Sequence, residues 1–233
     1  MRARVWGVGV GPGEPDLLTL RAARCIAGAA TVCYIAANAR PSRARAIAAE
    51  HIPEGAEEIA LPVPMSTDRR EADAEYARAA DRLRAEIAAG RDVAVLCEGD
   101  PLFYASFGYL REHLGESVPV SVIPGLTSVG AATARLGIPF TRQDDSHAVL
   151  TAASTDAAIA DALAKHDALA LLKAGPHRPR LAQLIREAER AAHAVYLEQI
   201  GYDNEAVYRG LDALPEGKGG YFGLFLVYPE ASA

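Results

Sequence analysis

The chain has 233 residues, of which 50% are hydrophobic and 23% charged, and its formal net charge is -6. This length allows one large domain or two compact ones, and the composition is that of a globular protein, not of a disordered or fibrous one. The acidic balance argues against a groove for nucleic acid, which needs a basic face. No apolar run approaches the roughly 18 residues of a membrane span, so we expect neither nucleic acid nor a membrane as a partner.

The three cysteines, Cys25, Cys33 and Cys97, are an odd number and form no C-x-x-C pair. A disulfide framework is therefore not expected, and a reducing compartment is favoured. The first residues are too rich in glycine to form the apolar core of a signal peptide, so we expect a cytoplasmic protein. The six histidines show no metal-like spacing, and we expect no metal site.

Hydrophobic periodicity predicts alternating strands and helices in the first half of the chain. The expected strands cover residues 5–10, 31–35, 58–61, 92–97 and 118–123. A helix is expected from Pro15, with Leu17, Leu18 and Leu20 on its apolar face. Further helices are expected at 43–51, 68–89, 102–114 and 128–136. This order implies crossover connections and a parallel sheet.

The second half predicts strands at 148–151, 168–172 and 194–198, with helices at 156–165 and 180–191. Two last strands, 206–209 and 221–228, flank the turn-rich segment 214–220, which is typical of a hairpin. Adjacent strands at the end imply a mixed sheet. We therefore predict two α/β domains, an N-terminal one with a parallel sheet (1–124) and a C-terminal one with a mixed sheet (125–233), with a cofactor cleft between them.

A glycine-rich turn, G-V-G-V-G-P-G at 7–13, follows the first strand. It does not fit the dinucleotide fingerprint G-x-G-x-x-G, because Pro12 stands five residues after Gly7 and Glu14 five after Gly9. No Gly-Lys-Ser/Thr follows, so a Walker A loop is excluded as well. Taken alone, the turn fits a tight structural connection as well as a close approach to a ligand.

Two more turns follow expected strands: E-G-D-P at 98–101 and P-G-L-T-S at 124–128. Each has a structural interpretation, because Asp100 could cap the next helix with Pro101 in its first turn, and Thr127 or Ser128 could cap the helix after it. Ligands of open α/β sheets, however, bind beyond the carboxyl ends of the strands. Three such turns at one sheet edge indicate a site more strongly than any one of them.

Together and in this order, the three turns resemble the tetrapyrrole (corrin/porphyrin) methylase family over nearly the whole chain. Within it, the segment E-G-D-P-L-F-Y-A-S at 98–106 and the residues after it are most similar to the branch that methylates C20 of precorrin-2. Glu14 stands where the family usually has aspartate, and Ala105 where the branch usually has glycine. Ile35 follows Tyr34, where the uroporphyrinogen branch has an acid that serves as base, and this favours a later precorrin step.

The resemblance implies a homodimer and S-adenosylmethionine as cofactor. The cofactor contacts it implies in the first half are Pro12, Glu98, Gly99, Asp100, Phe103, Thr127 and Ser128. Those it implies in the second half are Leu172, Lys173 and Gly201. It also implies that the loop of Gly11, Pro12 and Gly13 faces the tetrapyrrole.

The implied reaction is methylation of C20 of precorrin-2 or cobalt-precorrin-2 in cobalamin biosynthesis. A sulfonium methyl is reactive by itself, so the protein mainly aligns the reactants and excludes water. A base could remove the proton that the methylated carbon loses, and Tyr104, Glu98 and a substrate carboxylate are all candidates. Arg21 is one of several arginines that could pair with substrate carboxylates. The alternatives are another precorrin carbon, a non-tetrapyrrole target such as diphthine, or a carrier or sensor that binds a tetrapyrrole without turnover.

Overall fold

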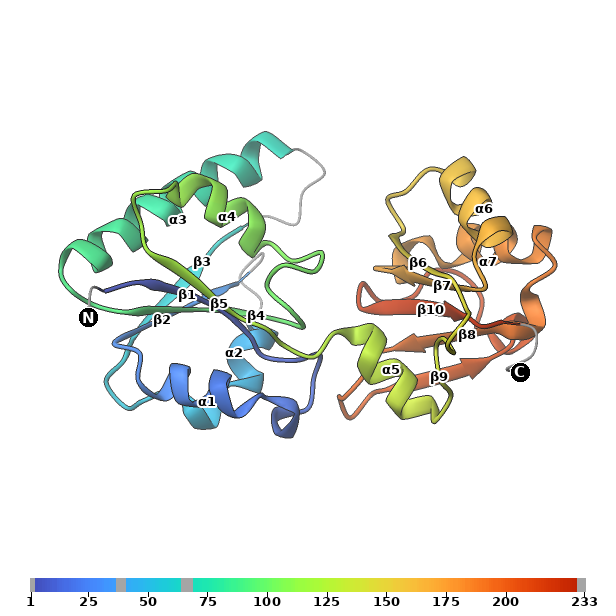
Figure 1. Ribbon diagram of the computed structural model, residues 1–233, viewed down its shortest axis with the longest axis horizontal. Helices are drawn as coiled ribbons and strands as arrows, with labels where there is room; N and C mark the ends of the chain where they lie inside the picture. Colours follow the sequence, from blue (N-terminus) through green and yellow to red (C-terminus); the bar gives the residue numbers. More distant parts are fainter. Residues whose placement is uncertain (1–2, 37–40, 64–68, 230–233) are drawn as a thin grey trace. The chain divides into compact units, whose positions relative to one another are not determined.

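The computed structural model describes residues 3–36, 41–63 and 69–229. The chain forms two compact units, Met1–Ser128 and Val129–Ala233 (Figure 1). Each unit contains one five-stranded sheet.

The sheet of the first unit is parallel throughout, as predicted, with the strand order β3-β2-β4-β1-β5. Its strands are β1 (Val5–Gly9), β2 (Thr31–Ile35), β3 (Glu57–Leu61), β4 (Val93–Cys97) and β5 (Val120–Ile123). Its helices are α1 (Leu20–Ala27), α2 (Arg43–Ile47), α3 (Arg69–Ala88) and α4 (Phe107–Leu114). Helices α3 and α4 cover one face of the sheet and α1 and α2 the other (Figure 1). Because all five strands run the same way, their carboxyl ends form one edge.

The ring of Phe107 is buried between helices α3 and α4 and the face of the sheet that they cover. Phe107, 2% exposed, belongs to the same apolar cluster as Leu83 of α3 and Ile59 of β3. Its ring lies over Gly7 of β1, where an added Cβ would come within 2.5 Å of the ring. The glycine that opens the turn-rich segment therefore has a packing role and makes room for an aromatic side chain in the core.

The buried carboxylate of Glu86 connects the end of α3 to the start of β2 by hydrogen bonds. Glu86, 6% exposed, accepts hydrogen bonds from the Thr31 hydroxyl at 2.7 Å and from Arg91 Nε and Nη2 at 2.7 and 2.9 Å. These contacts, the Arg91 hydrogen bond first, lower the pKa of Glu86 to about 2. The ionised form is therefore the one that the folded protein stabilises.

Replacing Glu86→Gln is expected to lower the free energy of unfolding by about 2 kcal/mol at pH 7, because the buried carboxylate loses its charge-assisted hydrogen bonds from the half-exposed Arg91. The folded pKa of Glu86 lies near 2, below its usual 4.5. The stabilisation is therefore complete above pH 4.5 and is lost as the pH falls toward 2. Urea unfolding at several pH values would show the difference between wild type and variant shrinking over that interval. A difference that does not change with pH would contradict the ionic role.

The second unit contains the mixed sheet, as predicted, in the order β6-β7-β10-β8-β9. Its strands are β6 (His147–Thr151), β7 (Ala168–Leu172), β8 (Ala194–Glu198), β9 (Ala206–Arg209) and β10 (Gly223–Val227). Its helices are α5 (Ser128–Leu136), α6 (Asp156–Lys165) and α7 (Arg178–Glu187). Helices α6 and α7 lie on one face of the sheet and α5 on the other (Figure 1). Strands β6 and β7 are parallel, whereas β10 runs antiparallel to both β7 and β8.

The predicted hairpin of the last two strands is wrong. β9 and β10 do not pair with each other, because β10 lies between β7 and β8, and β9 pairs with the other side of β8. Every residue of β10 is buried, whereas alternate residues of β9 are exposed. A strand that is apolar on both faces belongs in the sheet interior, and a strand of alternating polarity suits an edge.

Two predicted helix starts are also wrong. Pro15–Leu17 is a short 3-10 turn, and α1 begins only at Leu20, after Thr19, whose hydroxyl accepts the Ala22 amide at 3.1 Å. Leu20 is 79% exposed and therefore not part of an apolar face. Helix α4 begins at Phe107, not at residue 102, so Asp100 and Pro101 do not cap it. The expected start of α3 at residue 68 lies outside the described residues.

Candidate functional site

The three sequence turns meet at the carboxyl edge of the parallel sheet. Gly99, after β4, donates a hydrogen bond to the Gly11 carbonyl at 2.8 Å, and the Gly11 amide donates to the Gly99 carbonyl at 3.3 Å. Asp100 Oδ1 accepts the Leu102 amide at 2.8 Å, and its Oδ2 accepts the Gly125 amide at 3.1 Å. The carboxylate that the sequence suggested as a helix cap therefore joins the turn after β4 to the turn after β5.

The glycines of these turns allow three backbones to touch. A Cβ added to Gly125 would lie 2.1 Å from the Gly99 carbonyl oxygen, and one added to Gly9 would lie 2.4 Å from the Gly125 nitrogen. Gly11 and Gly99 also have left-handed backbones, with φ of 80° and 66°. Side chains are thus excluded from this junction by sterics and by backbone conformation, and the backbone itself forms its surface.

Two aromatic residues stand exposed next to the junction. Phe103 is 38% and Tyr104 45% exposed, and their rings meet edge to face with centroids 5.2 Å apart. Tyr104 has a left-handed backbone with φ of 55°, which is unfavourable for a side chain of this size. Strain of this kind collects at functional sites, where the surrounding structure maintains it.

An ion pair that the sequence did not indicate involves Glu98. Its Oε1 lies 3.0 Å from Nε of Arg43, the first residue of α2. Both side chains are largely buried, at 21% exposure for Arg43 and 27% for Glu98. Nothing in the local sequence marks Arg43, because the pairing depends on the packing of α2 beside β4. The Glu98 carboxylate, a candidate base, therefore already has a structural partner.

The remaining predicted residues of the first unit differ in exposure. Gly11 and Gly13 are buried and Pro12 is half-buried, so the loop presents mainly the proline ring. Thr127 and Ser128 are half-buried where α5 begins. Arg21 lies in the first turn of α1 and is exposed to solvent, and none of the described contacts brings it to the glycine junction.

The second unit gathers its predicted residues at the carboxyl ends of β7 and β8. Leu172 ends β7 and is 6% exposed, and Lys173 follows it, exposed, with a left-handed φ of 56°. Gln199, after β8, has the same φ of 56°. Gly201 has a φ of 77°, and its amide donates to Glu205 Oε2 at 2.8 Å. Two residues other than glycine, Lys173 and Gln199, thus have left-handed backbones at this edge.

The cysteines are not suited to nucleophilic catalysis. Burial raises the pKa of the Cys33 thiol to about 12 and that of Cys97 still further, and it raises the pKa of Cys25 to about 11. All three thiols are therefore protonated near neutral pH, and a thiol is a poor nucleophile in that form. All three are free. Across residues 3–36, 41–63 and 69–229, no cluster of three or more metal-ligating side chains occurs.

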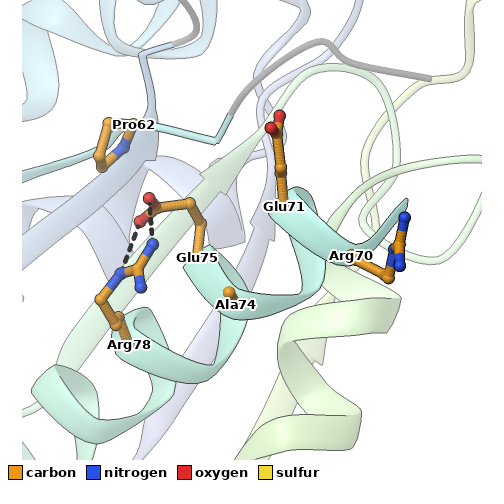
Figure 2. A pocket seen from close by; sticks show the side chains of 6 residues that line it. All are labelled: Pro62, Arg70, Glu71, Ala74, Glu75 and Arg78. Carbon is orange, nitrogen blue, oxygen red and sulfur yellow. Dashed lines mark hydrogen bonds and ion pairs between the residues drawn. The ribbon is translucent and has the colours of Figure 1, made fainter. Parts of the chain in front are cut away.

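A surface depression of a different character lies on α3 and after β3. Figure 2 shows its lining, which consists of Pro62, Arg70, Glu71, Ala74, Glu75 and Arg78. Glu75 and Arg78 form an ion pair within it, drawn as dashed lines. None of the predicted site residues lines this depression, and we assign it no role.

The fold and the glycine junction define a class: a protein of two α/β units in which backbone turns meet at the carboxyl edge of a parallel sheet, the edge where ligands of open α/β sheets bind. The sequence profile of the Tetrapyrrole (Corrin/Porphyrin) Methylases matches residues 4–213. The chain belongs to this family.

Two similar relatives are named for the same methylated carbon. A protein of Sinorhizobium sp named precorrin-2 C(20)-methyltransferase is 33% identical, over 96% of this chain and 94% of its own. A protein of Salmonella typhimurium named cobalt-precorrin-2 C(20)-methyltransferase is 30% identical, over 97% of each chain.

Solved structures agree with the fold. A uroporphyrin-III-C-methyltransferase from Thermus thermophilus is 28% identical with a TM-score of 0.69, covering 98% of this chain and 93% of that one. A cobalt precorrin-4 methyltransferase is 22% identical with a TM-score of 0.75, covering 97% and 94%. None of the helices in the described part of the chain is long and apolar enough to cross a membrane.

Proposed function

We propose that this protein transfers a methyl group from S-adenosylmethionine to C20 of precorrin-2, or of cobalt-precorrin-2, in cobalamin biosynthesis. The observation that carries the proposal is the similarity over nearly the whole chain to two relatives named for this carbon. The departure at Ile35, which leaves no acid after Tyr34, supports a precorrin step over the uroporphyrinogen step.

The residues at the two sheet edges fit the proposed cofactor. Its proposed contacts in the first unit are Pro12, Glu98, Gly99, Asp100, Phe103, Thr127 and Ser128, and in the second unit Leu172, Lys173 and Gly201. In support, Gly9 and Gly125 have no room for a Cβ because the turns touch there, whereas a Cβ at Gly99 would meet only the Leu126 carbonyl oxygen, at 3.9 Å, so open space adjoins the turns at Gly99. The exposed rings of Phe103 and Tyr104 beside it can cover apolar parts of a ligand.

When bound, the cofactor supplies an electrophilic methyl group. The chain then has to hold the tetrapyrrole in line with that methyl group and to exclude water, and alignment alone can contribute several kcal/mol. We propose that the loop of Gly11, Pro12 and Gly13 contacts the tetrapyrrole and that Arg21 binds one of its carboxylates. We further propose that the proton of the methylated carbon passes to the Tyr104 oxygen while the Tyr104 hydroxyl releases its own proton to water, because Tyr104 is 45% exposed whereas Glu98 is paired with Arg43.

We further propose a homodimer that acts in the cytoplasm. Three free cysteines, two of them on neighbouring strands of one core, support a reducing compartment. Sedimentation velocity would report the oligomeric state.

The test is an anaerobic incubation with enzymatically prepared precorrin-2 and S-adenosylmethionine, with the product read by mass spectrometry and NMR. We expect one added methyl group, at C20, and a parallel reaction with cobalt-precorrin-2 would show which form is the substrate. A methyl group on a different carbon would overturn the proposed regiochemistry. Binding of the tetrapyrrole with no S-adenosylhomocysteine formed would indicate a carrier or sensor.

A further inference from the structure

A buried ion pair in the second unit lies directly beneath the edge that carries Leu172 and Lys173. Arg178, the first residue of α7, is 3% exposed, and its Nη1 lies 3.5 Å from Oε1 of Glu198, the last residue of β8. Its guanidinium also lies over the Tyr196 ring, 5.5 Å from the centroid. Neither Arg178 nor Glu198 is among the residues proposed above to contact the cofactor.

The other two nitrogens of the Arg178 guanidinium bind the backbone of residues 216–220, the loop before β10. Arg178 Nε donates to the Gly217 carbonyl and Nη2 to the Glu216 carbonyl, each at 3.1 Å. Oε1 of Glu198 accepts the Gly220 amide at 3.1 Å from the same loop. The two charged side chains therefore fix residues 216–220 by their backbone, independently of the side chains of that loop.

Tyr196 completes this cluster. Its hydroxyl donates to Glu198 Oε1 at 2.5 Å, and its ring is fully buried against Phe225. Burial, with the Glu198 hydrogen bond second, raises the pKa of Tyr196, so the hydroxyl stays a donor. A Cβ at Gly219 would lie 1.8 Å from Glu198 Oε1, and one at Gly223 would lie 2.2 Å from the Tyr196 hydroxyl. Gly219 in the loop and Gly223 at the start of β10 thus leave room for the Glu198 carboxylate and the Tyr196 hydroxyl.

The loop in turn contacts the edge that carries the proposed cofactor residues. The Gly219 amide donates to the Gly175 carbonyl at 2.8 Å, and Ala174 donates to Gly223 at 2.7 Å. The Lys173 ammonium lies 6.0 Å from the centroid of the Tyr221 ring. A change in the loop backbone would therefore move residues 173–175, which follow β7.

We infer that Arg178 and Glu198 are positioning residues for the cofactor: they fix the 216–220 loop, which sets the backbone after β7 in the shape that binds S-adenosylmethionine. This inference rests on the proposed function, because Leu172, Lys173 and Gly201 are its proposed contacts in this unit. A buried ion pair adds little net stability compared with an apolar replacement, and in some proteins it instead selects one conformation. A loop that is already held in its binding conformation binds a ligand more tightly, because less conformational entropy of the loop is lost on binding.

The test compares Arg178→Met and Glu198→Gln with the wild-type protein. S-adenosylhomocysteine binding is measured by calorimetry and the melting temperature by heat denaturation. Steady-state kinetics with precorrin-2 give kcat and the KM for S-adenosylmethionine. We expect each variant to bind S-adenosylhomocysteine about tenfold more weakly and to raise KM for S-adenosylmethionine about as much. We expect kcat to change little, because the reacting atoms are not touched.

Arg190→Met is the matched control, because Arg190 also donates to backbone carbonyls, but near the amino end of β7. It donates to the Leu163 carbonyl at 3.0 Å and to the Tyr228 carbonyl at 2.9 Å. We expect this variant to melt at a lower temperature and to bind with wild-type affinity. Glu198→Gln keeps the size of the side chain but removes the charge that pairs with Arg178 and accepts the Gly220 amide, so it remains informative if Arg178→Met does not fold.

Variants that are less stable but bind as tightly as wild type would overturn the inference and leave the proposed function intact. Wild-type protein that binds no S-adenosylhomocysteine would overturn both. If wild type binds S-adenosylhomocysteine, Arg178→Met and Glu198→Gln bind it more weakly and Arg190→Met binds it as wild type does, the inference is supported whichever carbon the enzyme methylates.

Discussion

Replacing Gly125→Ala is expected to lower kcat/KM for the methyl transfer by at least about a hundredfold. The added Cβ would lie 2.1 Å from the Gly99 carbonyl oxygen and 2.8 Å from the Gly9 backbone. Both neighbours are backbone atoms, so no flexible side chain can give way, and the turns after β1, β4 and β5 must separate. That movement also breaks the hydrogen bond from the Gly125 amide to Asp100. Steady-state kinetics with precorrin-2 and S-adenosylmethionine would measure the loss.

Gly108→Ala is the control for this variant. Gly108 lies in α4 of the same unit, and a Cβ there would meet no atom within 4 Å. We expect unchanged activity and, because alanine favours helix over glycine, a gain of about 0.5 kcal/mol in stability. The Gly125→Ala variant is expected to lose about 1–3 kcal/mol from overpacking. Wild-type activity in Gly125→Ala would show that the three turns need not touch for catalysis.

The parts of the fold that could be predicted are those determined by local patterns. Strands β2, β7 and β8 and helices α5 and α6 have the predicted bounds, because each is a compact apolar or amphipathic run between clear breaks. The parallel sheet followed from the alternation of strands and helices. The pairing of β10 was missed because a glycine-rich segment before a strand predicts a hairpin, whereas burial of β10 on both faces places it inside the sheet.

The candidate site shows the same division. Its turns could be recognised because glycine, proline and aspartate cluster where strands end. The role of Asp100 could not be recognised, because its partner Gly125 follows a different strand and only the sheet order brings the two together. The pair of Glu98 with Arg43 and the pair of Glu198 with Arg178 were missed for the same reason. Contacts between side chains far apart in the sequence leave no periodic signal.

The second large effect is expected for Gly99→Leu, which should reduce the affinity for S-adenosylhomocysteine at least about a hundredfold, below detection by calorimetry. Gly99 has a φ of 66°, a conformation that costs a leucine roughly 1–2 kcal/mol. The nearest atom to an added Cβ is the Leu126 carbonyl oxygen at 3.9 Å, so the side chain would extend into open space beside the turns. That space is where we propose that the cofactor lies. The substitution therefore combines backbone strain with direct exclusion of the ligand.

Gly55→Leu separates these two effects. Gly55 has a φ of 88°, is exposed, and would have no atom within 4 Å of an added Cβ, so it introduces similar backbone strain without blocking the proposed site. Both variants should unfold at lower urea concentrations than wild type, whereas only Gly99→Leu should lose the ligand. If both variants bind S-adenosylhomocysteine as wild type does, the assignment of the cofactor to the turn after β4 is wrong. If both lose it equally, the loss reports instability of the unit and not occupation of the site.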